Sequence, residues 1–234
     1  MEKLSSTTAI ITAAGSGLRL PGNEKKQFRE LGGIPILIRA MEPFMLSAQI
    51  DNVIVTVPED EVSYCEALIE SYYEYLDKPL LVIAGGGERQ DSVFGALQSC
   101  PTGTDFVAIH DGVRPFVRPE LLEELLELAE QELAVIPAAR IKHTVKQIEG
   151  DYAVLTLPRK QLVQVFTPQV FAFPLIMEAY LKAYADGFLG TDDSSLIERL
   201  GKKVRFLLCN DFNLKITDET DLFFATQLIE KNLR

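Results

Sequence analysis

The chain has 234 residues, of which 47% are apolar and 24% are charged, a balance that is ordinary for a folded protein and excludes extensive disorder. Its formal net charge of -11 argues against a general nucleic-acid binder or a protein that binds anionic membranes, because both need a basic surface. If the ligand is a phosphate, the cations must therefore be concentrated in one place.

The spacing of the cysteines and the hydropathy of the chain predict its cellular compartment. The three cysteines are far apart and form no CxxC pair, which favours buried thiols in a reducing cytoplasm over a disulfide framework. The apolar run at 9–14 is too short for the core of a signal peptide, and no stretch approaches the roughly 18 apolar residues of a membrane span. We expect a cytoplasmic protein that binds neither nucleic acid nor membrane.

Strands and helices alternate through the first 132 residues. Short β-rich runs predict strands at 7–14, 52–58, 80–87 and 105–115. The segments after them predict helices at 35–46, 59–76, 89–100 and 119–132. This alternation is typical of a mostly parallel sheet with helices on both faces, in which ligands bind beyond the carboxyl ends of the strands.

The alternation breaks near residue 140. Residues 142–159 alternate with period two around an Asp/Glu/Gly turn, which predicts a hairpin that projects from the domain and joins two subunits. Further along, 162–173 returns to the core, 191–201 reads as a capped helix, 203–210 as a strand, and a last helix starts near Asp218. We expect one α/β, Rossmann-like domain over 1–234 with a β-arm at about 140–160.

Three loops at predicted strand ends, at 14–26, 84–92 and 110–115, carry glycines and cations. A parallel sheet would bring them to one edge, although each loop alone is equally well explained as a tight turn.

In the first loop, Gly15 and Gly17 allow close approach of a ligand to backbone N–H groups, and Arg19, Lys25 and Lys26 add charge. The dinucleotide fingerprint is absent because Leu20 stands where its third glycine would be, and no Gly-Lys-Ser/Thr completes a Walker loop.

The other two loops add polar groups. Arg89 and Ser92 follow the second loop's glycines, while in the third loop Asp111 could hold a divalent cation or a hydroxyl, or merely cap a turn, and Arg114 could bind an anion. The only two histidines, His110 and His143, have no thiol or carboxylate at ligand spacing, so neither a transition-metal site nor a Ser-His-Asp triad is supported.

Seven blocks carry a resemblance to a known family. In order from residue 13 to 222 they are AAGSGLRL…KKQF…GGIPIL, GGGERQDSV, HDGVRPF, HTVK, PRKQLVQVFTPQVF, TDDSSLIERLG and NLKITDETDL. Together they resemble the 2-C-methyl-D-erythritol 4-phosphate cytidylyltransferases of the non-mevalonate isoprenoid pathway. The resemblance implies a Rossmann-like homodimer joined through the arm. It also implies Mg²⁺-dependent transfer of CMP from CTP to the polyol phosphate, giving 4-diphosphocytidyl-2-C-methyl-D-erythritol and pyrophosphate.

The resemblance also implies roles for individual residues. Catalytic roles at the triphosphate fall to Arg19 and Lys26. The nucleotide would be bound by Ala13, Ala14, Gly15, Gly17, Gly86, Glu88, Ser92, Asp111 and Gly112, with Asp111 also at the metal. The acceptor would be bound by Arg114, Thr144, Arg159, Thr167, Thr191 and Lys215, where Thr144 and Arg159 reach in from the partner's arm.

The chain departs from the family's usual pattern at two places. His143 stands where the family has an aspartate before the arm threonine, and Gly112-Val113 replace two alanines. Val113 is shared with ribitol-5-phosphate cytidylyltransferases and keeps that acceptor open, whereas the block at 191–198 favours methylerythritol phosphate. Two other classes stay open, a nicotinamide-dependent reductase and a non-catalytic nucleotide-binding protein.

Overall fold

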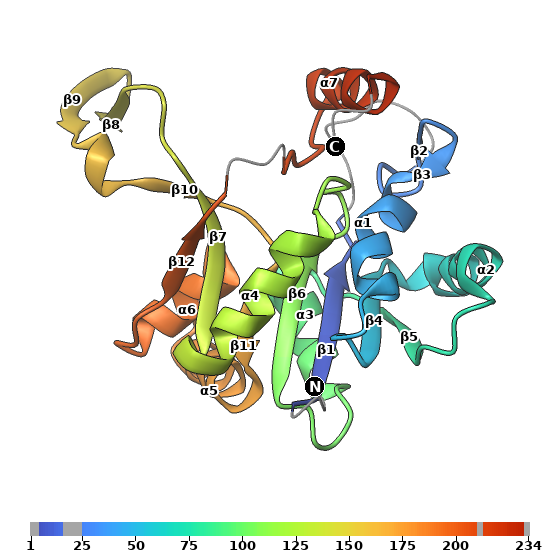
Figure 1. The fold of residues 1–234 in the computed structure, drawn as a ribbon. Helices are drawn as coiled ribbons and strands as arrows, with labels where there is room; N and C mark the ends of the chain where they lie inside the picture. The colour runs from blue at the N-terminus through green and yellow to red at the C-terminus, as the bar shows by residue number, and fades with distance from the viewer. Residues whose placement is uncertain (1–4, 16–24, 210–212, 232–234) are drawn as a thin grey trace.

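A central eight-stranded sheet organises the chain, and the computed structural model describes residues 5–15, 25–209 and 213–231 (Figure 1). The strand order is β10-β7-β11-β6-β1-β4-β5, with β12 paired to β7. The strands are β1 (Thr7–Thr12), β4 (Asn52–Val57), β5 (Leu80–Ala84), β6 (Phe106–Asp111), β7 (Ala134–Arg140), β10 (Val163–Val165), β11 (Gln169–Ala172) and β12 (Arg205–Leu208). β5, β4, β1 and β6 run parallel, as do β12 and β7, whereas β10 and β11 are antiparallel to their neighbours.

Helices cover both faces of the sheet, which confirms the predicted fold class. One face packs against α1 (Ile36–Leu46), α2 (Val62–Tyr73) and α4 (Pro119–Glu132). The other packs against α3 (Arg89–Gln98), α5 (Phe173–Ala185) and α6 (Asp193–Arg199). A seventh helix, α7 (Glu219–Glu230), packs with the small hairpin of β2 (Glu30–Leu31) and β3 (Ile34–Pro35).

The central strand β1 shows why the sheet is stable. Its side chains alternate between the two cores, so that Ala9 and Ile11 face α1 and α4 while Ile10 faces α3, and all three are fully buried. A strand covered on both faces reads as a continuous apolar run, as the sequence at 9–11 does.

We expect Ile10→Ala to lower the free energy of unfolding by about 2–5 kcal/mol, because it removes buried methyl groups and leaves a cavity between tightly packed elements. Urea titration followed by circular dichroism measures the loss. The exposed Leu81→Ala on β5 is the matched control, and an equal loss in both variants would contradict this account of the core.

Two larger elements are absent from the sequence prediction. Strand β7 contains Pro137, and proline in a run argues against a central strand. Proline removes one N–H donor from the strand, but its carbonyl accepts a hydrogen bond from the Phe166 N–H at 2.9 Å, so pairing continues on that side. Helix α5 begins with Pro174 in its first turn and has Tyr180 and Ile176 buried against the sheet. The predicted helix at 59–76 is a 3₁₀ turn (Glu59–Glu61) followed by α2.

The predicted β-arm is present. Strands β8 (Val145–Glu149) and β9 (Tyr152–Leu157) form a separate antiparallel pair that projects from the sheet (Figure 1). Gly150 turns the chain between them with a φ of +54°. The arm exposes Ile148, Tyr152 and Leu155, of which Tyr152 is 79% exposed. An isolated two-stranded hairpin is only marginally stable in water, and exposed apolar side chains mark surfaces that bind a partner. The arm therefore has the features of an interaction surface.

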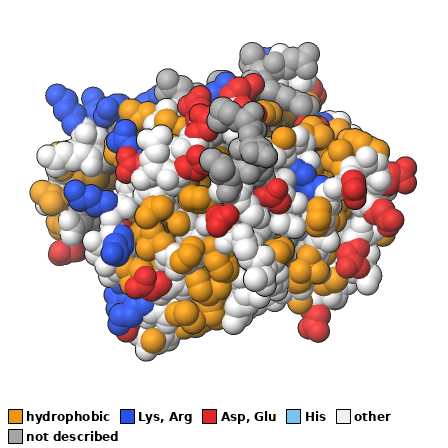
Figure 2. All heavy atoms as spheres, turned by 60° about the horizontal axis from the view of Figure 1, so that its bottom comes forward, with side chains coloured by type: hydrophobic (Ala, Val, Ile, Leu, Met, Phe, Trp, Pro, Cys, Tyr) orange, Lys and Arg blue, Asp and Glu red, His pale blue; other side chains and the backbone are white. Residues whose placement is uncertain are grey.

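The burial of the cysteines and the distribution of surface charge bear on the compartment and on the ligands of the protein. Cys65 and Cys209 are buried, Cys100 is half-buried, and burial raises the pKa of Cys65 and of Cys100 to about 12. Figure 2 shows lysines and arginines gathered toward the left edge, with acidic side chains spread over the rest of that face. Within the described ranges, no helix combines the length and hydropathy needed to cross a bilayer. The cytoplasmic location stays a prediction.

Candidate active site

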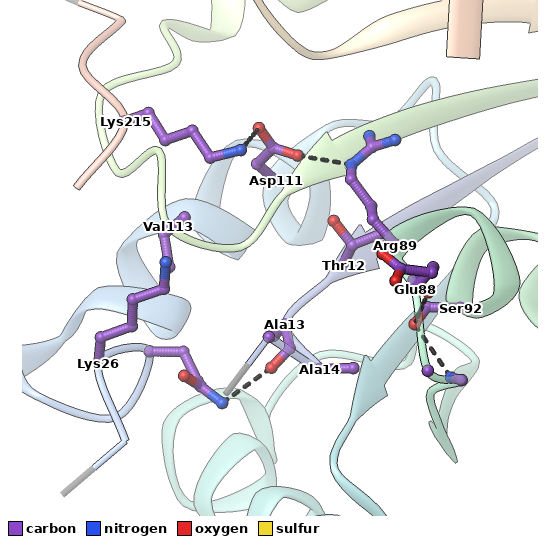
Figure 3. Close-up of a pocket in the computed structure, with 14 residues that line it drawn as sticks. Thr12, Ala13, Ala14, Lys26, Glu88, Arg89, Ser92, Asp111, Val113 and Lys215 are labelled. Atoms are coloured by element: carbon purple, nitrogen blue, oxygen red, sulfur yellow. Dashed lines mark hydrogen bonds and ion pairs between the residues drawn. The ribbon is translucent and has the colours of Figure 1, made fainter. Parts of the chain in front are cut away.

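The three loops singled out in the sequence meet at the carboxyl edge of the sheet. Parallel register places Thr12 of β1 beside Asp111 of β6 and beside Thr56 of β4, and Val57 beside Ala84 of β5. The chain that follows β1, β5 and β6 surrounds a pocket of about 340 Å³ (Figure 3).

Most of the residues predicted to bind a nucleotide line this pocket, which we call the first pocket. They are Ala13, Ala14, Gly15, Gly86, Glu88, Ser92 and Asp111, and Lys26, predicted as a catalytic residue, lines it with them. Figure 3 shows Lys26 across the pocket from Glu88 and Ser92. Gly17, predicted to bind the nucleotide, and Arg19, predicted to be catalytic, lie outside the described residues.

Gly112, also predicted to bind the nucleotide, does not line this pocket, although its neighbours Asp111 and Val113 do. Its N–H donates to the Thr12 carbonyl at 2.8 Å, and an added Cβ would lie 3.0 Å from Leu37 Cδ1 and 3.1 Å from Ala13 Cβ. The turn therefore approaches β1 closely, and a side chain at this position would require Leu37 or Ala13 to shift.

The loop after β5 is held in shape by its own polar groups. The Ser92 hydroxyl accepts from the Gly86 N–H at 3.1 Å and donates to the Glu88 carbonyl at 3.2 Å, while the Glu88 N–H donates to Asp91 Oδ2 at 3.0 Å. A Cβ on Gly86 would lie 2.3 Å from Asp91 Cβ, so this position requires glycine. Because α3 begins here, its positive amino end faces the pocket and favours an anion.

Asp111 is the centre of charge. Its Oδ1 accepts from Arg89 Nε at 3.0 Å, and its Oδ2 lies 3.1 Å from Arg114 Nε and 3.0 Å from Lys215 Nζ. Burial alone would raise the pKa of this carboxyl, but the cations of Arg89, Lys215 and Arg114 outweigh burial and hold the pKa well below its ordinary range. Asp111 is therefore ionised at neutral pH and gathers three cations at the end of β6.

The four acceptor residues predicted within one chain share a second pocket of about 410 Å³. Arg114, Thr167, Thr191 and Lys215 all line it. Asp111, Arg89 and Lys215 line both pockets, so the two cavities lie side by side with a common charged wall.

The direction of the Thr167 hydroxyl follows from its partners. The Asp111 N–H donates to it at 3.1 Å, and it lies 2.9 Å from Nδ1 of His110, whose Nε2 lies 3.1 Å from the Arg114 carbonyl. Burial lowers the pKa of His110 to about 4, so the ring is neutral and its one proton is on Nε2, where only a carbonyl is available. Thr167 therefore donates to His110, and this hydroxyl cannot donate to an acceptor phosphate.

Sequence reasoning missed several residues of the second pocket. Gln169, Asp192, Ser194, Ser195 and Glu198 line it. The signal was the polar start of the predicted helix at 191–201, which indicated a cap but not a pocket. Asp192 does cap α6, accepting from the Ser195 N–H at 2.9 Å.

Known proteins match almost the whole chain. The family IspD, described as 2-C-methyl-D-erythritol 4-phosphate cytidylyltransferase, matches residues 7–231. This chain belongs to that family. A curated relative of this name from Bacillus mycoides is 40% identical over 222 residues, covering 95% of this chain and 97% of the relative. Another, from Geobacillus thermodenitrificans, is 41% identical over 225 residues, with 96% and 97% covered.

Solved structures agree with the family assignment. The 4-diphosphocytidyl-2C-methyl-D-erythritol synthase of Anaerococcus prevotii superposes with a TM-score of 0.85 at 33% identity and covers 97% of this chain and 99% of its own. The 2-C-methyl-D-erythritol 4-phosphate cytidylyltransferase of Francisella tularensis gives a TM-score of 0.80 at 29% identity, with 95% and 99% covered.

Within this cytidylyltransferase fold, the two neighbouring lysines of the first loop differ. Lys25 pairs with Asp60 at 3.0 Å and with Glu61 at 2.9 Å, at the start of the segment that leads into α2. Lys26 lines the first pocket, which Lys25 does not. The tertiary structure thus separates two adjacent lysines that look alike in sequence.

The two arm residues predicted to bind the acceptor lie elsewhere. Thr144 and Arg159 are exposed and line neither pocket of their own chain. Arg159 Nη1 donates to the Lys142 carbonyl at 2.7 Å, which ties the two sides of the arm together at its base. Within a single chain, these two residues therefore contribute to neither pocket.

Few side chains of the described residues could coordinate a metal ion at this site. Among the residues that the structure describes, no three His, Cys, Asp or Glu side chains form a metal-binding group. Asp111, however, lines the first pocket, and within the described part of the chain its Oδ1 accepts a hydrogen bond only from Arg89, which leaves acceptor capacity on that oxygen. Mg²⁺ is commonly held by one or two carboxylates together with substrate phosphates and water, so the residues present fit a cation that arrives with a triphosphate.

Proposed function

We propose that this chain transfers CMP from CTP to 2-C-methyl-D-erythritol 4-phosphate and releases pyrophosphate. The observation that carries the proposal is the pair of adjoining pockets with a shared wall of Arg89, Asp111 and Lys215. One pocket presents backbone and cations to a nucleotide, and the other presents Arg114 and Lys215 to an anionic acceptor. Membership of the family supplies the names of the two substrates.

The reaction needs no general base. The acceptor phosphate is already an anion at neutral pH, so one of its oxygens attacks the α-phosphorus of CTP directly. A new P–O bond forms as the bond between the α-phosphorus and the bridging oxygen breaks, and the electron pair leaves with pyrophosphate. Catalysis then consists of positioning and of stabilising negative charge.

Charge repulsion is the main obstacle. Two unit charges 4 Å apart repel by roughly 1 kcal/mol in water but by about 4 kcal/mol at an effective dielectric of 20. Lys26 would offset this at the triphosphate, and Arg114 and Lys215 at the acceptor phosphate. Asp111 would hold Mg²⁺, which when bound to the CTP phosphates neutralises charge and polarises the α-phosphoryl group.

We also propose that the protein acts as a homodimer joined through the arm. The exposed Ile148, Tyr152 and Leu155 support this, because a second copy would cover them. In the dimer, Thr144 and Arg159 would reach the acceptor phosphate in the partner's site.

Ribitol 5-phosphate is the nearest alternative acceptor, suggested by Val113. The family match and the curated relatives named above favour methylerythritol phosphate instead.

Pyrophosphate release, measured with each of the four ribonucleoside triphosphates and with both polyol phosphates, tests the proposal. We expect rapid release only with CTP and 2-C-methyl-D-erythritol 4-phosphate. Preference for ribitol 5-phosphate would overturn the acceptor assignment, and CTP binding without release would indicate a non-catalytic nucleotide-binding protein.

A further inference from the structure

Two buried groups beside the first pocket have no role in the mechanism above. Asp193, the first residue of α6, is fully buried, and Tyr180 of α5 is 1% exposed. Their polar atoms meet, because the Tyr180 hydroxyl donates to Asp193 Oδ1 at 2.5 Å. A carboxylate without solvent needs such partners, and the strongest of them is Arg89.

Arg89 joins this pair to the active site. Its Nη1 and Nη2 donate to the two oxygens of Asp193 at 3.0 and 2.8 Å, while its Nε donates to Asp111 Oδ1 at 3.0 Å. This two-pronged geometry fixes the plane of the guanidinium, which a lysine could not reproduce. All three nitrogens of the Arg89 guanidinium donate to carboxylates of the protein, so this side chain holds neighbouring residues in place rather than binding a ligand.

The contacts form one continuous chain of hydrogen bonds, Tyr180–Asp193–Arg89–Asp111, which we call the relay. The relay begins at the buried Tyr180 of α5 and continues through the first residues of α6 and α3. It ends at the Asp111 carboxylate, which lines both pockets. Asp193 itself lines neither of these two pockets.

We propose that Asp193 and Tyr180 are positioning residues, which act through Arg89 to hold the Asp111 carboxylate in the orientation that serves the nucleotide and the acceptor together. For the catalytic step this rests on the proposed function. Without Asp193, Arg89 would be left beside one carboxylate instead of two, free to rotate toward the phosphates and to pull away from Asp111.

A double-mutant cycle tests the relay. The four proteins are the wild type, Asp193→Asn, Asp111→Asn and the double variant, each measured for kcat/KM and for the dissociation constant of CTP. We expect Asp193→Asn to lower kcat/KM by about tenfold or more in the wild-type background. In the Asp111→Asn background the same change should cost less than about threefold, because its target is already gone.

A merely structural role for Asp193 gives a different result. In that case its replacement lowers kcat/KM and raises the dissociation constant by the same factors in both backgrounds, and this additivity would overturn the proposal. CTP binding requires no reaction, so the cycle still decides the question if the wild type proves inactive with 2-C-methyl-D-erythritol 4-phosphate, a result that would count against the proposed function alone.

Two further variants guard against loss of folding. Tyr180→Phe removes only the hydroxyl and keeps the ring in the core. We expect it to lower kcat/KM less than Asp193→Asn does in the wild-type background, and to have little further effect in the Asp111→Asn background. Asp186→Asn is the matched control, because Asp186 pairs with Lys182 and Arg199 on the surface near the same helices without contact to the relay. We expect it to leave kcat/KM and CTP binding unchanged in both backgrounds.

Discussion

Replacing Lys26 by alanine is expected to lower kcat by about 10²–10³-fold while the fold is retained. Lys26 lines the first pocket beside Gly15 and Gln27, where a triphosphate would lie against the amino end of α3. Removal of one preorganised donor to charge that develops in a transition state typically costs about 2.7–4 kcal/mol. We expect a loss of the same order for Arg19→Ala, whose position lies outside the described residues.

The neighbouring Lys25→Ala is the matched control for this prediction. It removes the same charge one residue away, but Lys25 pairs with Asp60 and Glu61 and does not line the first pocket. Exposed ion pairs contribute little, so we expect nearly unchanged kcat and stability. Steady-state pyrophosphate release and thermal unfolding measure the outcomes. Near-normal turnover in both Lys26→Ala and Arg19→Ala would refute the catalytic assignment.

Mixing two inactive variants is expected to restore activity if the arm completes the partner's site. We predict that Arg159→Ala and Lys26→Ala are each strongly impaired as homodimers. In a hybrid dimer, the site that keeps Lys26 is completed by the arm that keeps Arg159, so one of the two sites is intact. Random exchange of equal amounts then returns roughly a quarter of the wild-type sites.

The arm offers a matched control for this experiment. When Arg159→Ala is mixed with Thr144→Ala, both lesions are on arms and every hybrid site receives a defective one. Activity should therefore stay low. Hybrid dimers are isolated with two affinity tags before assay. If verified Arg159→Ala/Lys26→Ala hybrids are no more active than their parents, the sites are not shared between subunits.

The sequence predicts most of the fold because periodicity and turn residues act locally. Alternating strands and helices, the hairpin around Gly150 and the cap at Asp192 all follow from neighbours within a few positions. Strand β7 is absent from the sequence prediction, and its pairing with β12, β10 and β11 is visible only in the tertiary structure because those partners lie far from it in the chain.

The candidate active site, like the fold, could be predicted from the sequence only in part. The sequence by itself determined that cations and glycines follow three parallel strands, and its motifs matched the family. Only the tertiary structure decided that Lys25 turns to Asp60 while Lys26 lines the pocket, and that Arg89 and Asp193, 104 positions apart, form one ion pair behind Asp111. Charge and hydrogen-bond direction depend on which groups meet in space, and folding brings together residues that no local pattern connects.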